Sequence, residues 1–125
     1  MVSRDLKSNV DAAASITPAV RNAAVNGSGV DLKGYASAAV IFQVGTVTDG
    51  THTPSVQESD DNSTFTAVAA GDLDGTLVNL VANSVQRVGY HGRRRYLRAQ
   101  VTSSGATGAA YAAMVLRGHP GQSPV

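Results

Sequence analysis

The chain has 125 residues, a formal net charge of +1 and no cysteine. This length suits one domain with a single core, and the near-neutral charge gives no overall field that would draw the protein onto nucleic acid or an anionic membrane. The lack of cysteine excludes disulfides and thiolate metal sites.

The amino-acid composition favours strands over helices. Hydrophobic residues make up 42% of the chain, with 17 Val against 7 Leu, 13 Gly and no Trp. β-branched residues fit pleated, half-buried strands, and glycine supplies tight turns. We therefore expect an all-β protein whose thin core is built mostly from small aliphatic side chains.

Residues 1–24 form the first segment of the chain. The alanine run at 11–15 would permit a short helix, but Pro18 prevents a long one and disfavours helix at Thr17. This segment is interpreted as an extended N-terminal arm or an edge strand. The first ten residues carry charges where a secretory signal would need an apolar segment. We expect a soluble protein that is used without export.

From residue 25 onward, turn signals recur along the chain. Clusters of Gly, Asn, Asp and Ser stand at 26–29, 48–50, 60–63, 73–75, 90–92 and 103–108. These residues tolerate the positive φ that tight turns need. The spacing predicts an antiparallel β-sandwich of about eight strands over 25–118, with a jelly roll as one such arrangement. Residues 119–125 are predicted to be a loose C-terminal tail.

Three segments show the pattern of strands. Both faces of residues 36–44 are apolar, which predicts a central strand that is covered on both sides. That run is too short for a membrane span of about 20 residues. In residues 96–101, Leu97, Ala99 and Val101 alternate with polar or aromatic residues, which predicts one wet face. Residues 109–116 are also apolar on both faces, so a strand is expected there without a face assignment.

Enzyme and metal motifs are missing from the sequence. His52, His91 and His119 show no metal-ligand spacing with one another or with a Glu, and the first two fall in turns where we expect exposed side chains. The sequence contains no G-x-S-x-G elbow and no Walker loop. The glycines at 27 and 29 lead into a strand-like segment, which argues against a phosphate cradle. We expect no catalytic activity and no cofactor or metal.

The acidic cluster "ESDDNS" at 58–63 allows two interpretations. Its carboxylates could bind calcium, but the terminal bidentate Glu of a specific calcium loop is missing. The favoured interpretation is a hairpin turn in which Asp60 or Asn62 accepts hydrogen bonds from backbone N–H groups.

Three consecutive arginines, Arg93, Arg94 and Arg95, stand in the stretch "VGYHGRRRYLRAQV". On a strand they would alternate between faces, with Arg94, Tyr96 and Arg98 on one side, so they cannot form one continuous basic face. Nucleic-acid binding needs a wider basic surface with aromatic platforms and is not favoured. We expect ion pairs with carboxylates, inside the subunit or across an interface. The candidates are Asp60, Asp61, Asp72 and Asp74.

Residues 30–75 and 88–102 together resemble small virion proteins of tailed bacteriophages and prophages. The resemblance lies in a "GY.SA" strand, a "DG.HT" turn, an "ESDD..TFT.V" hairpin and a "VGY.G.RRYLR" strand. Members with assigned roles include capsid decoration, or cement, proteins. The resemblance implies a non-enzymatic protein on the capsid surface, made in the host cytoplasm. It also implies binding to the major capsid protein, often as a homotrimer, and no membrane partner.

Interface residues follow from this resemblance and from the local charge. Arg4, Asp5 and Lys7 on the N-terminal arm are candidates for reaching a neighbouring subunit. Arg93, Arg94, Arg95, Tyr96 and Arg98 are candidates on the later strand. Two alternatives stay open: a head-to-tail joining or tail-tube subunit, and a discoidin-like carbohydrate-binding module. For the second, Phe65 would stand where that family carries tryptophan.

Overall fold

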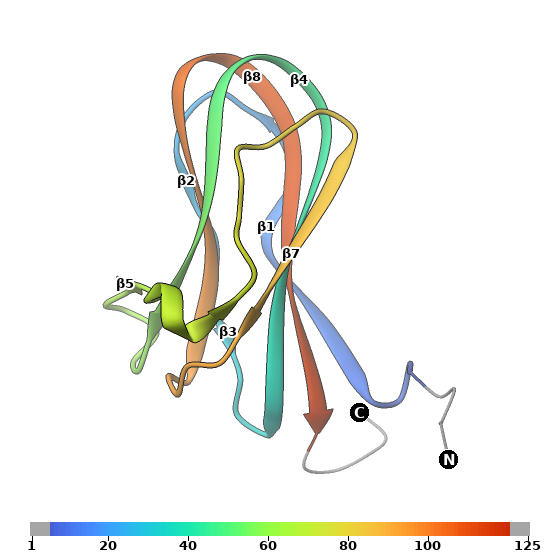
Figure 1. Ribbon diagram of the computed structural model, residues 1–125, viewed down its shortest axis with the longest axis vertical. Coiled ribbons are helices and arrows are strands. Elements are labelled where there is room, and N and C mark those ends of the chain that lie inside the picture. The colour runs from blue at the N-terminus through green and yellow to red at the C-terminus, as the bar shows by residue number, and fades with distance from the viewer. Residues whose placement is uncertain (1–5, 121–125) are drawn as a thin grey trace.

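The computed structural model describes residues 6–120, which form one antiparallel sheet of eight strands (Figure 1). In chain order the elements are β1 (Val10–Arg21), β2 (Val25–Asn26), β3 (Val30–Asp31), β4 (Tyr35–Ser59), β5 (Thr66–Ala67), the 3₁₀ turn η1 (Ala70–Asp72), β6 (Leu73–Asp74), β7 (Ser84–Tyr90) and β8 (Tyr96–Pro120). No α-helix occurs among the described residues. The all-β, antiparallel fold class is confirmed.

Two long strands organise the sheet. β4 and β8 have 25 residues each, and they pair antiparallel from Tyr35 with Pro120 to Ser59 with Tyr96. Both strands bend at the same height, where the register shifts between Val44 and Thr51. Figure 1 shows them arching together at the top, so that the sheet curls over and its two halves face each other.

The arch corrects the predicted strand boundaries. The turn signals at 48–50 and 103–108 were expected to end strands, but β4 and β8 run through them. Gly50 and Gly105 have φ of 85° and 63°, a conformation that glycine adopts without steric cost. The expected pair of separate sheets, with jelly-roll connections, is not confirmed, because the strands form one hydrogen-bonded sheet that curls on itself.

The two halves of the curled sheet have different strands beside the long pair. The first half-sheet contains β1, residues 109–120 of β8, residues 35–44 of β4, β7 and the short β6. The second half-sheet contains residues 51–59 of β4 and 96–104 of β8, flanked by β2, β3 and β5. The core lies between the two halves.

Aliphatic side chains dominate the core, as the composition predicted. Phe42, Val40 and Val115 from the first half-sheet and Leu97 and Val101 from the second are fully buried. The alternation predicted for residues 96–101 is confirmed, since Leu97, Ala99 and Val101 are buried while the residues between them are partly exposed. β4 is central in the sheet, as expected for residues 36–44. The expected cover on both sides is missing among the described residues, since Ser37 and Gln43 on the outward side are exposed.

The segments at the two ends of the sheet are paired strands. For residues 10–21 the sequence left an arm or an edge strand open, and the structure has the edge strand β1. Pro18 lies where its register with β8 shifts, which is where an edge strand tolerates a residue without an N–H donor. At the other end, residues 119 and 120, which were predicted to begin a loose tail, extend β8.

His52 lies inside the arch and is only 1% exposed, so the expectation of an exposed turn residue is wrong. Because β4 continues through this position, His52 points inward together with Pro54 and Val56. Its ring nitrogens lie 2.9 Å from Ser103 Oγ and 3.1 Å from the Asp49 carbonyl oxygen. The imidazole thus links the two bent strands.

None of the described residues forms a helix that is long and apolar enough to cross a membrane.

Candidate interaction surface at the arginine loop

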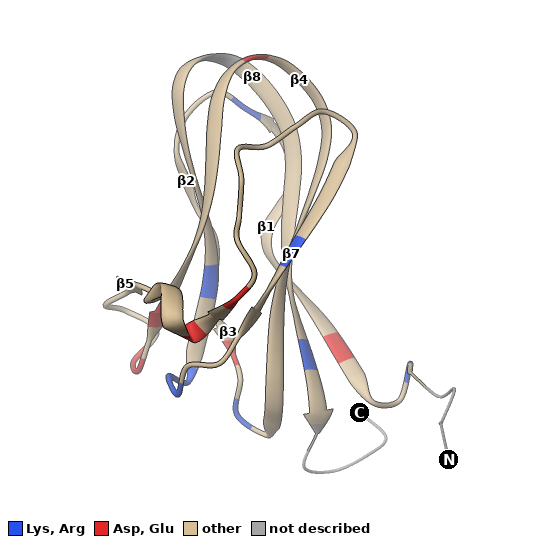
Figure 2. Cartoon of the chain, viewed as in Figure 1, with Lys and Arg blue, Asp and Glu red and all other residues tan. Residues whose placement is uncertain are grey.

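The arginine loop, residues 92–95, connects β7 to β8 at the end of the molecule away from the arch. Charged residues gather in this lower half of the molecule (Figure 2). Gly92 passes directly over the Tyr90 side chain: a Cβ atom at Gly92 would lie 2.3 Å from Tyr90 Oη. Only glycine therefore fits at the start of the loop.

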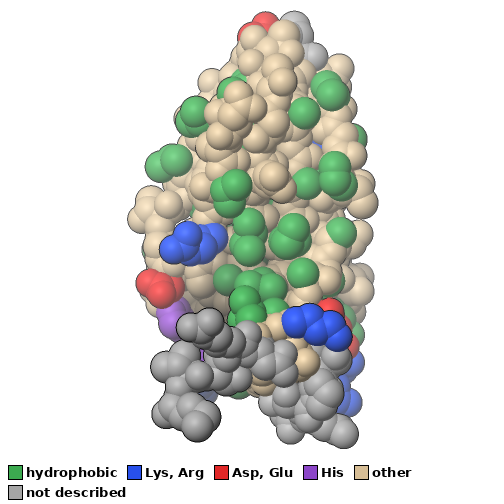
Figure 3. All heavy atoms as spheres, turned by 90° about the vertical axis from the view of Figure 1, so that its right-hand side faces the viewer, with side chains coloured by type: hydrophobic (Ala, Val, Ile, Leu, Met, Phe, Trp, Pro, Cys, Tyr) green, Lys and Arg blue, Asp and Glu red, His purple; other side chains and the backbone are tan. Residues whose placement is uncertain are grey.

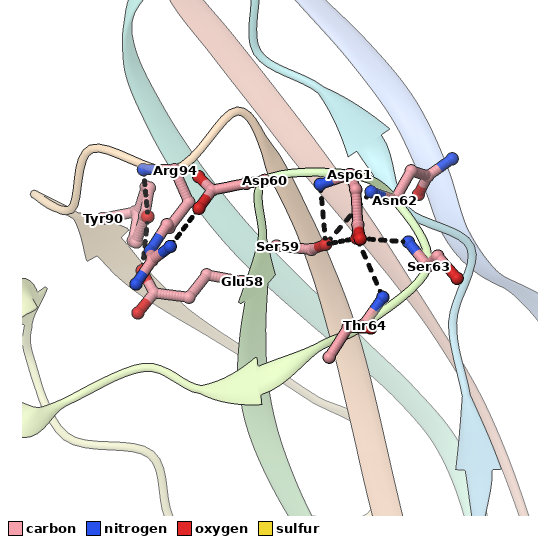
Figure 4. Close-up of polar contacts among 9 residues, drawn as sticks. All are labelled: Glu58, Ser59, Asp60, Asp61, Asn62, Ser63, Thr64, Tyr90 and Arg94. Atoms are coloured by element: carbon pink, nitrogen blue, oxygen red, sulfur yellow. Dashed lines mark hydrogen bonds and ion pairs between the residues drawn. The ribbon is translucent and has the colours of Figure 1, made fainter.

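Tyr90 fixes the position of the loop. Its ring is buried, and its hydroxyl donates a hydrogen bond of 2.6 Å to Glu58 Oε1 on β4. The same oxygen accepts the backbone N–H of Arg94 at 3.1 Å (Figure 4). Burial, and then the hydrogen bond to Glu58, raise the pKa of Tyr90 well above its usual value. The phenol therefore stays protonated and holds the loop against β4.

Two of the three arginines pair with carboxylates of the same chain. Arg94 forms an ion pair with Asp60, as the sequence analysis expected. Arg95 binds Asp31 with both ends of its guanidinium, at 2.9 Å and 2.8 Å. That bidentate contact, followed by the Lys33 N–H bond to the same carboxylate, lowers the pKa of Asp31 to about 2. Asp31 on β3 was not among the predicted partners.

The turn at 58–63 is held by Ser59 and Asp61. Ser59 Oγ accepts the N–H groups of Asp61 and Asn62 at 3.1 Å and 3.0 Å. Asp61 Oδ1 accepts the N–H groups of Ser63 and Thr64, both at 2.9 Å, and these bonds lower the pKa of Asp61 (Figure 4). The hairpin interpretation is confirmed, but the acceptor is Asp61, not Asp60 or Asn62. Its carboxylate is occupied, so it does not pair with arginine.

Tyr96 and Arg98 lie at the start of β8 and face outward, as the alternation predicted. Arg98 Nε donates to Gln57 Oε1 at 2.7 Å, and its guanidinium stands 4.0 Å from the centre of the Phe65 ring. The Arg95 guanidinium lies 5.2 Å from the centre of the Tyr96 ring. One face of Phe65, the residue at the tryptophan position of the discoidin-like alternative, is thus covered by a cation.

A hollow of about 370 Å³ opens between the arginine loop and the segment that joins β3 to β4. Its lining includes Lys33, Arg93, Arg94 and Arg95, and no carboxylate. Arg93 is exposed and makes no hydrogen bond or ion pair with any residue in the range 6–120. The hollow therefore has two cations, Arg93 and Lys33, whose charges no ion pair neutralises in the described part of the chain. Such a site suits an anionic group of a partner.

Arg117 is a further arginine at this end of the molecule that sequence reasoning missed. It pairs with Asp11 on β1 and donates to the Asp31 carbonyl oxygen at 2.9 Å. Its guanidinium also lies 4.8 Å from the centre of the Tyr35 ring. It closes the end of the core between β1 and β3.

The other candidate residues are not brought to this site. Arg4 and Asp5 lie outside the described residues, and Lys7 is exposed before the start of β1. Asp72 and Asp74 do not pair with the arginine loop; Asp74 lies 3.8 Å from His91. Among residues 6–120, no three His, Asp or Glu side chains cluster as metal ligands would.

No protein-family model and no curated protein matches the chain. Among solved structures, it is similar to a chain in the structure of infectious bursal disease virus, Gx strain, with a TM-score of 0.48 and 10% sequence identity. That similarity covers 92% of this chain and 35% of the other, so this chain spans about a third of the length of the protein it matches.

Proposed function

We propose that the protein is a non-enzymatic structural component of a bacteriophage virion. Its proposed role is that of a capsid decoration, or cement, protein on the head surface. It would bind across neighbouring major capsid protein subunits as a homo-oligomer, with the trimer as the form that the sequence resemblance implies.

The main support for this proposal is that the two segments that resemble phage virion proteins meet at one surface. The hairpin segment contributes Glu58 and Asp60, and the later strand contributes Tyr90 and Arg94. These pairs are separated by more than thirty residues in sequence, yet Tyr90 bonds Glu58 and Arg94 pairs with Asp60. The two segments that carry the resemblance therefore form a single surface of the folded protein.

The arginine loop is suited to docking because contacts within the same chain already hold it in place before a capsid subunit binds. Tyr90 holds the loop backbone, and Asp60 and Asp31 hold two of the arginines. Binding then costs little ordering of the loop. Arg93 and Lys33 remain to attract carboxylates of a capsid subunit, and guanidinium groups suit bidentate contacts with carboxylates.

Stabilisation of the capsid follows from mass action. A protein that binds the assembled shell more tightly than free subunits favours the assembled state. Many copies of a modest contact, repeated over the shell, are sufficient for this effect.

A co-sedimentation experiment tests the proposal. Phage heads stripped of the protein are mixed with purified protein, and the fraction that pellets with the heads is measured. Because Arg93 faces the partner without an ion pair of its own, Arg93→Glu should weaken binding by at least about tenfold. Thr102→Glu, on the exposed outer side of the second half-sheet, is the control and should bind normally. Heads reloaded with wild-type protein should resist heating better than stripped heads.

Other outcomes would overturn the cement role. Protein recovered only in purified tails or necks would favour the head-to-tail joining or tail-tube role. Specific hits on a glycan array without capsid binding would favour a carbohydrate-binding module. Equal capsid binding by wild type and Arg93→Glu would remove the arginine loop from the interface.

A further inference from the structure

The outward side of the first half-sheet is mostly apolar. On β4 and β8, Val40, Phe42 and Val115 point into the core, so the residues between them point outward. The outward set is mostly apolar: Ala39 and Ile41 on β4, Ala112, Met114 and Leu116 on β8, and Val85 on β7. It also contains the polar Ser37 and Gln43 on β4 and the charged Arg87 on β7. Figure 3 shows hydrophobic side chains spread along this side of the molecule. We call this surface the apolar face.

The same two strands have a polar outward side in the second half-sheet. There Ser55 Oγ donates to Gln100 Oε1 at 3.0 Å, and Gln100 Nε2 donates to Asn26 Oδ1 at 2.7 Å. Arg98 and Gln57 form the next cross-strand pair. The outward residues of β4 and β8 therefore change from mostly apolar side chains to hydrogen-bonded polar side chains when the strands pass the arch.

This contrast indicates that the apolar face is buried in the working protein. An antiparallel sheet with one solvated side normally alternates apolar and polar residues, as the second half-sheet does. The first half-sheet is mostly apolar on both sides, which is the pattern of a sheet that is covered on both sides. In the part of the chain that the structure describes, Val85 is 63% exposed and Val20 is 74% exposed, so the cover is missing. A contiguous apolar patch of this kind marks an association surface.

We infer that a second copy of this chain covers the apolar face. The available area is sufficient: four strands about 4.8 Å apart, each contributing about ten residues at about 3.3 Å, give a footprint of roughly 600 Å². An equal surface on the neighbouring copy brings the total to roughly 1,200 Å², the lower bound of specific protein interfaces.

Charge also favours a copy of the same chain. Arg87 on β7 is the charged side chain among the outward residues of the first half-sheet, and it lies toward one edge of the face. A nearly uncharged face has no electrostatic penalty for meeting another of its kind. Apolar interfaces that are depleted of charge are characteristic of permanent homo-oligomers.

A groove adds shape to the face. Next to the register shift of β1, a hollow of about 360 Å³ is lined by Pro18, Val20, Gly45 and Tyr111, among others. Val20 projects beside it. A projecting aliphatic side chain of the second copy can enter such a hollow, which gives the packing a defined register.

The self-association does not depend on the capsid role, because the apolar face and the arginine loop are separate surfaces. A second copy is present whenever the chain is synthesised, whereas a capsid is met later. Covering the apolar face at once protects the free protein from aggregation and leaves the arginine loop open for docking.

The test measures the mass of the full chain by sedimentation equilibrium over a range of concentrations. Wild type should be larger than a monomer. Met114→Glu places a carboxylate in the interface between Ala14 and Ile41, and it should weaken association by at least about 100-fold, since an unpaired buried charge is strongly unfavourable. Ile41→Glu places its carboxylate beside Arg87 and should weaken association by a smaller factor. In the monomer, Ile41→Glu stands beside Arg87 in the sheet register, so the fold can accommodate it. Thr102→Glu is the matched control and should associate like wild type.

Cysteine labelling gives a second readout, because the chain has no cysteine of its own. Ala112→Cys on the apolar face should react with a maleimide at least about tenfold more slowly than Thr102→Cys on the polar side. A monomeric wild type, or equal labelling of the two positions, would overturn the inference. Full association of both glutamate variants would also overturn it, because the interface would then lie elsewhere. Protection of Ala112→Cys only after capsids are added would assign the face to the capsid and not to a copy of the chain.

Discussion

Three identical side chains in a row acquire three different states from their surroundings. Arg95 is bound at both ends by Asp31, Arg94 is paired with Asp60, and Arg93 has no partner among residues 6–120. The backbone conformation of the loop, which Tyr90 holds, determines these differences, because it directs each guanidinium toward a different segment. The charge available for a partner is therefore smaller than the sequence suggests, and it is concentrated at Arg93 and Lys33.

The Asp31–Arg95 pair should make stability depend on pH in a defined window. The pKa of Asp31 in the folded protein, about 2, lies below its ordinary value of 3.8. The ionised carboxylate therefore stabilises the fold at higher pH, and this contribution is lost as the pH falls from about 4 to about 2. When the pH is lowered from about 6 to about 2.5, Asp31→Asn should lose less free energy of unfolding than wild type. Because the pair is partly exposed, the difference should be at most about 1 kcal/mol.

Urea unfolding at the two pH values measures this difference. Arg95→Gln should reduce the pH dependence in the same way, and the double variant should add nothing further. Equal pH dependence in wild type and Asp31→Asn would contradict the assignment.

Period-two alternation predicted the positions of the strands correctly. The strand ends that were predicted from glycine residues were wrong. Residues 36–44, 96–101 and 109–116 lie in strands as the pattern predicted. The glycines at 50 and 105 were interpreted as hairpin turns, yet each lies within a strand. A positive φ at glycine is compatible with a tight turn or with a bend. Which one forms depends on whether the neighbouring strand bends at the same height, and that neighbour is distant in sequence.

Large sequence separation also explains why some contacts of the arginine loop were not predicted. The outward direction of Tyr96 and Arg98 follows from local alternation, and it was predicted. The contact of Arg95 with Asp31 spans 64 positions, and no local pattern singles out Asp31 from the other carboxylates. Glu58 was recognised only as part of an acidic cluster, because its partner Tyr90 lies on another strand.

Glycine at the bend of β4 should be required for its backbone conformation. Gly50 has a φ of 85°, so Gly50→Ala should lower the free energy of unfolding by about 1 kcal/mol, since a Cβ atom is disfavoured there. Gly71→Ala is the control, because Gly71 has no positive φ and its Cβ would meet nothing within 4 Å. Urea unfolding should rank Gly50→Ala below Gly71→Ala. Equal stability of the two variants would show that the bend does not need glycine.

At the scale of the molecule, nearly all pairing is between segments far apart in the chain. β4 pairs with β8 along its whole length. β1 also pairs with β8, and these two strands lie near opposite ends of the sequence, as the pairing of Val10 with Gly118 shows. The local pairings are short: β4 with β5 across the turn at 58–63, and β6 with β7. The loop-closure entropy of the long-range pairings must be overcome before they stabilise the chain.

Refolding should therefore be slow for a chain of this size. After dilution from urea, recovery of the β-sheet circular-dichroism signal should take milliseconds to seconds, as it does for other β proteins rich in non-local contacts. Double-jump experiments, with a short time in the unfolded state, separate this phase from proline isomerisation. Complete refolding within microseconds would contradict the topology described here.

The pairing of Val10 with Gly118 places the beginning of β1 and the end of β8 side by side, at the pole that carries the arginine loop. Passenger domains joined to the first or last strand would start from that crowded pole. The bend around Gly105 lies at the opposite pole, where a Cβ atom would meet nothing within 4 Å. A peptide inserted there would extend from the pole opposite the arginine loop, which makes the arch the natural position for displaying foreign sequences.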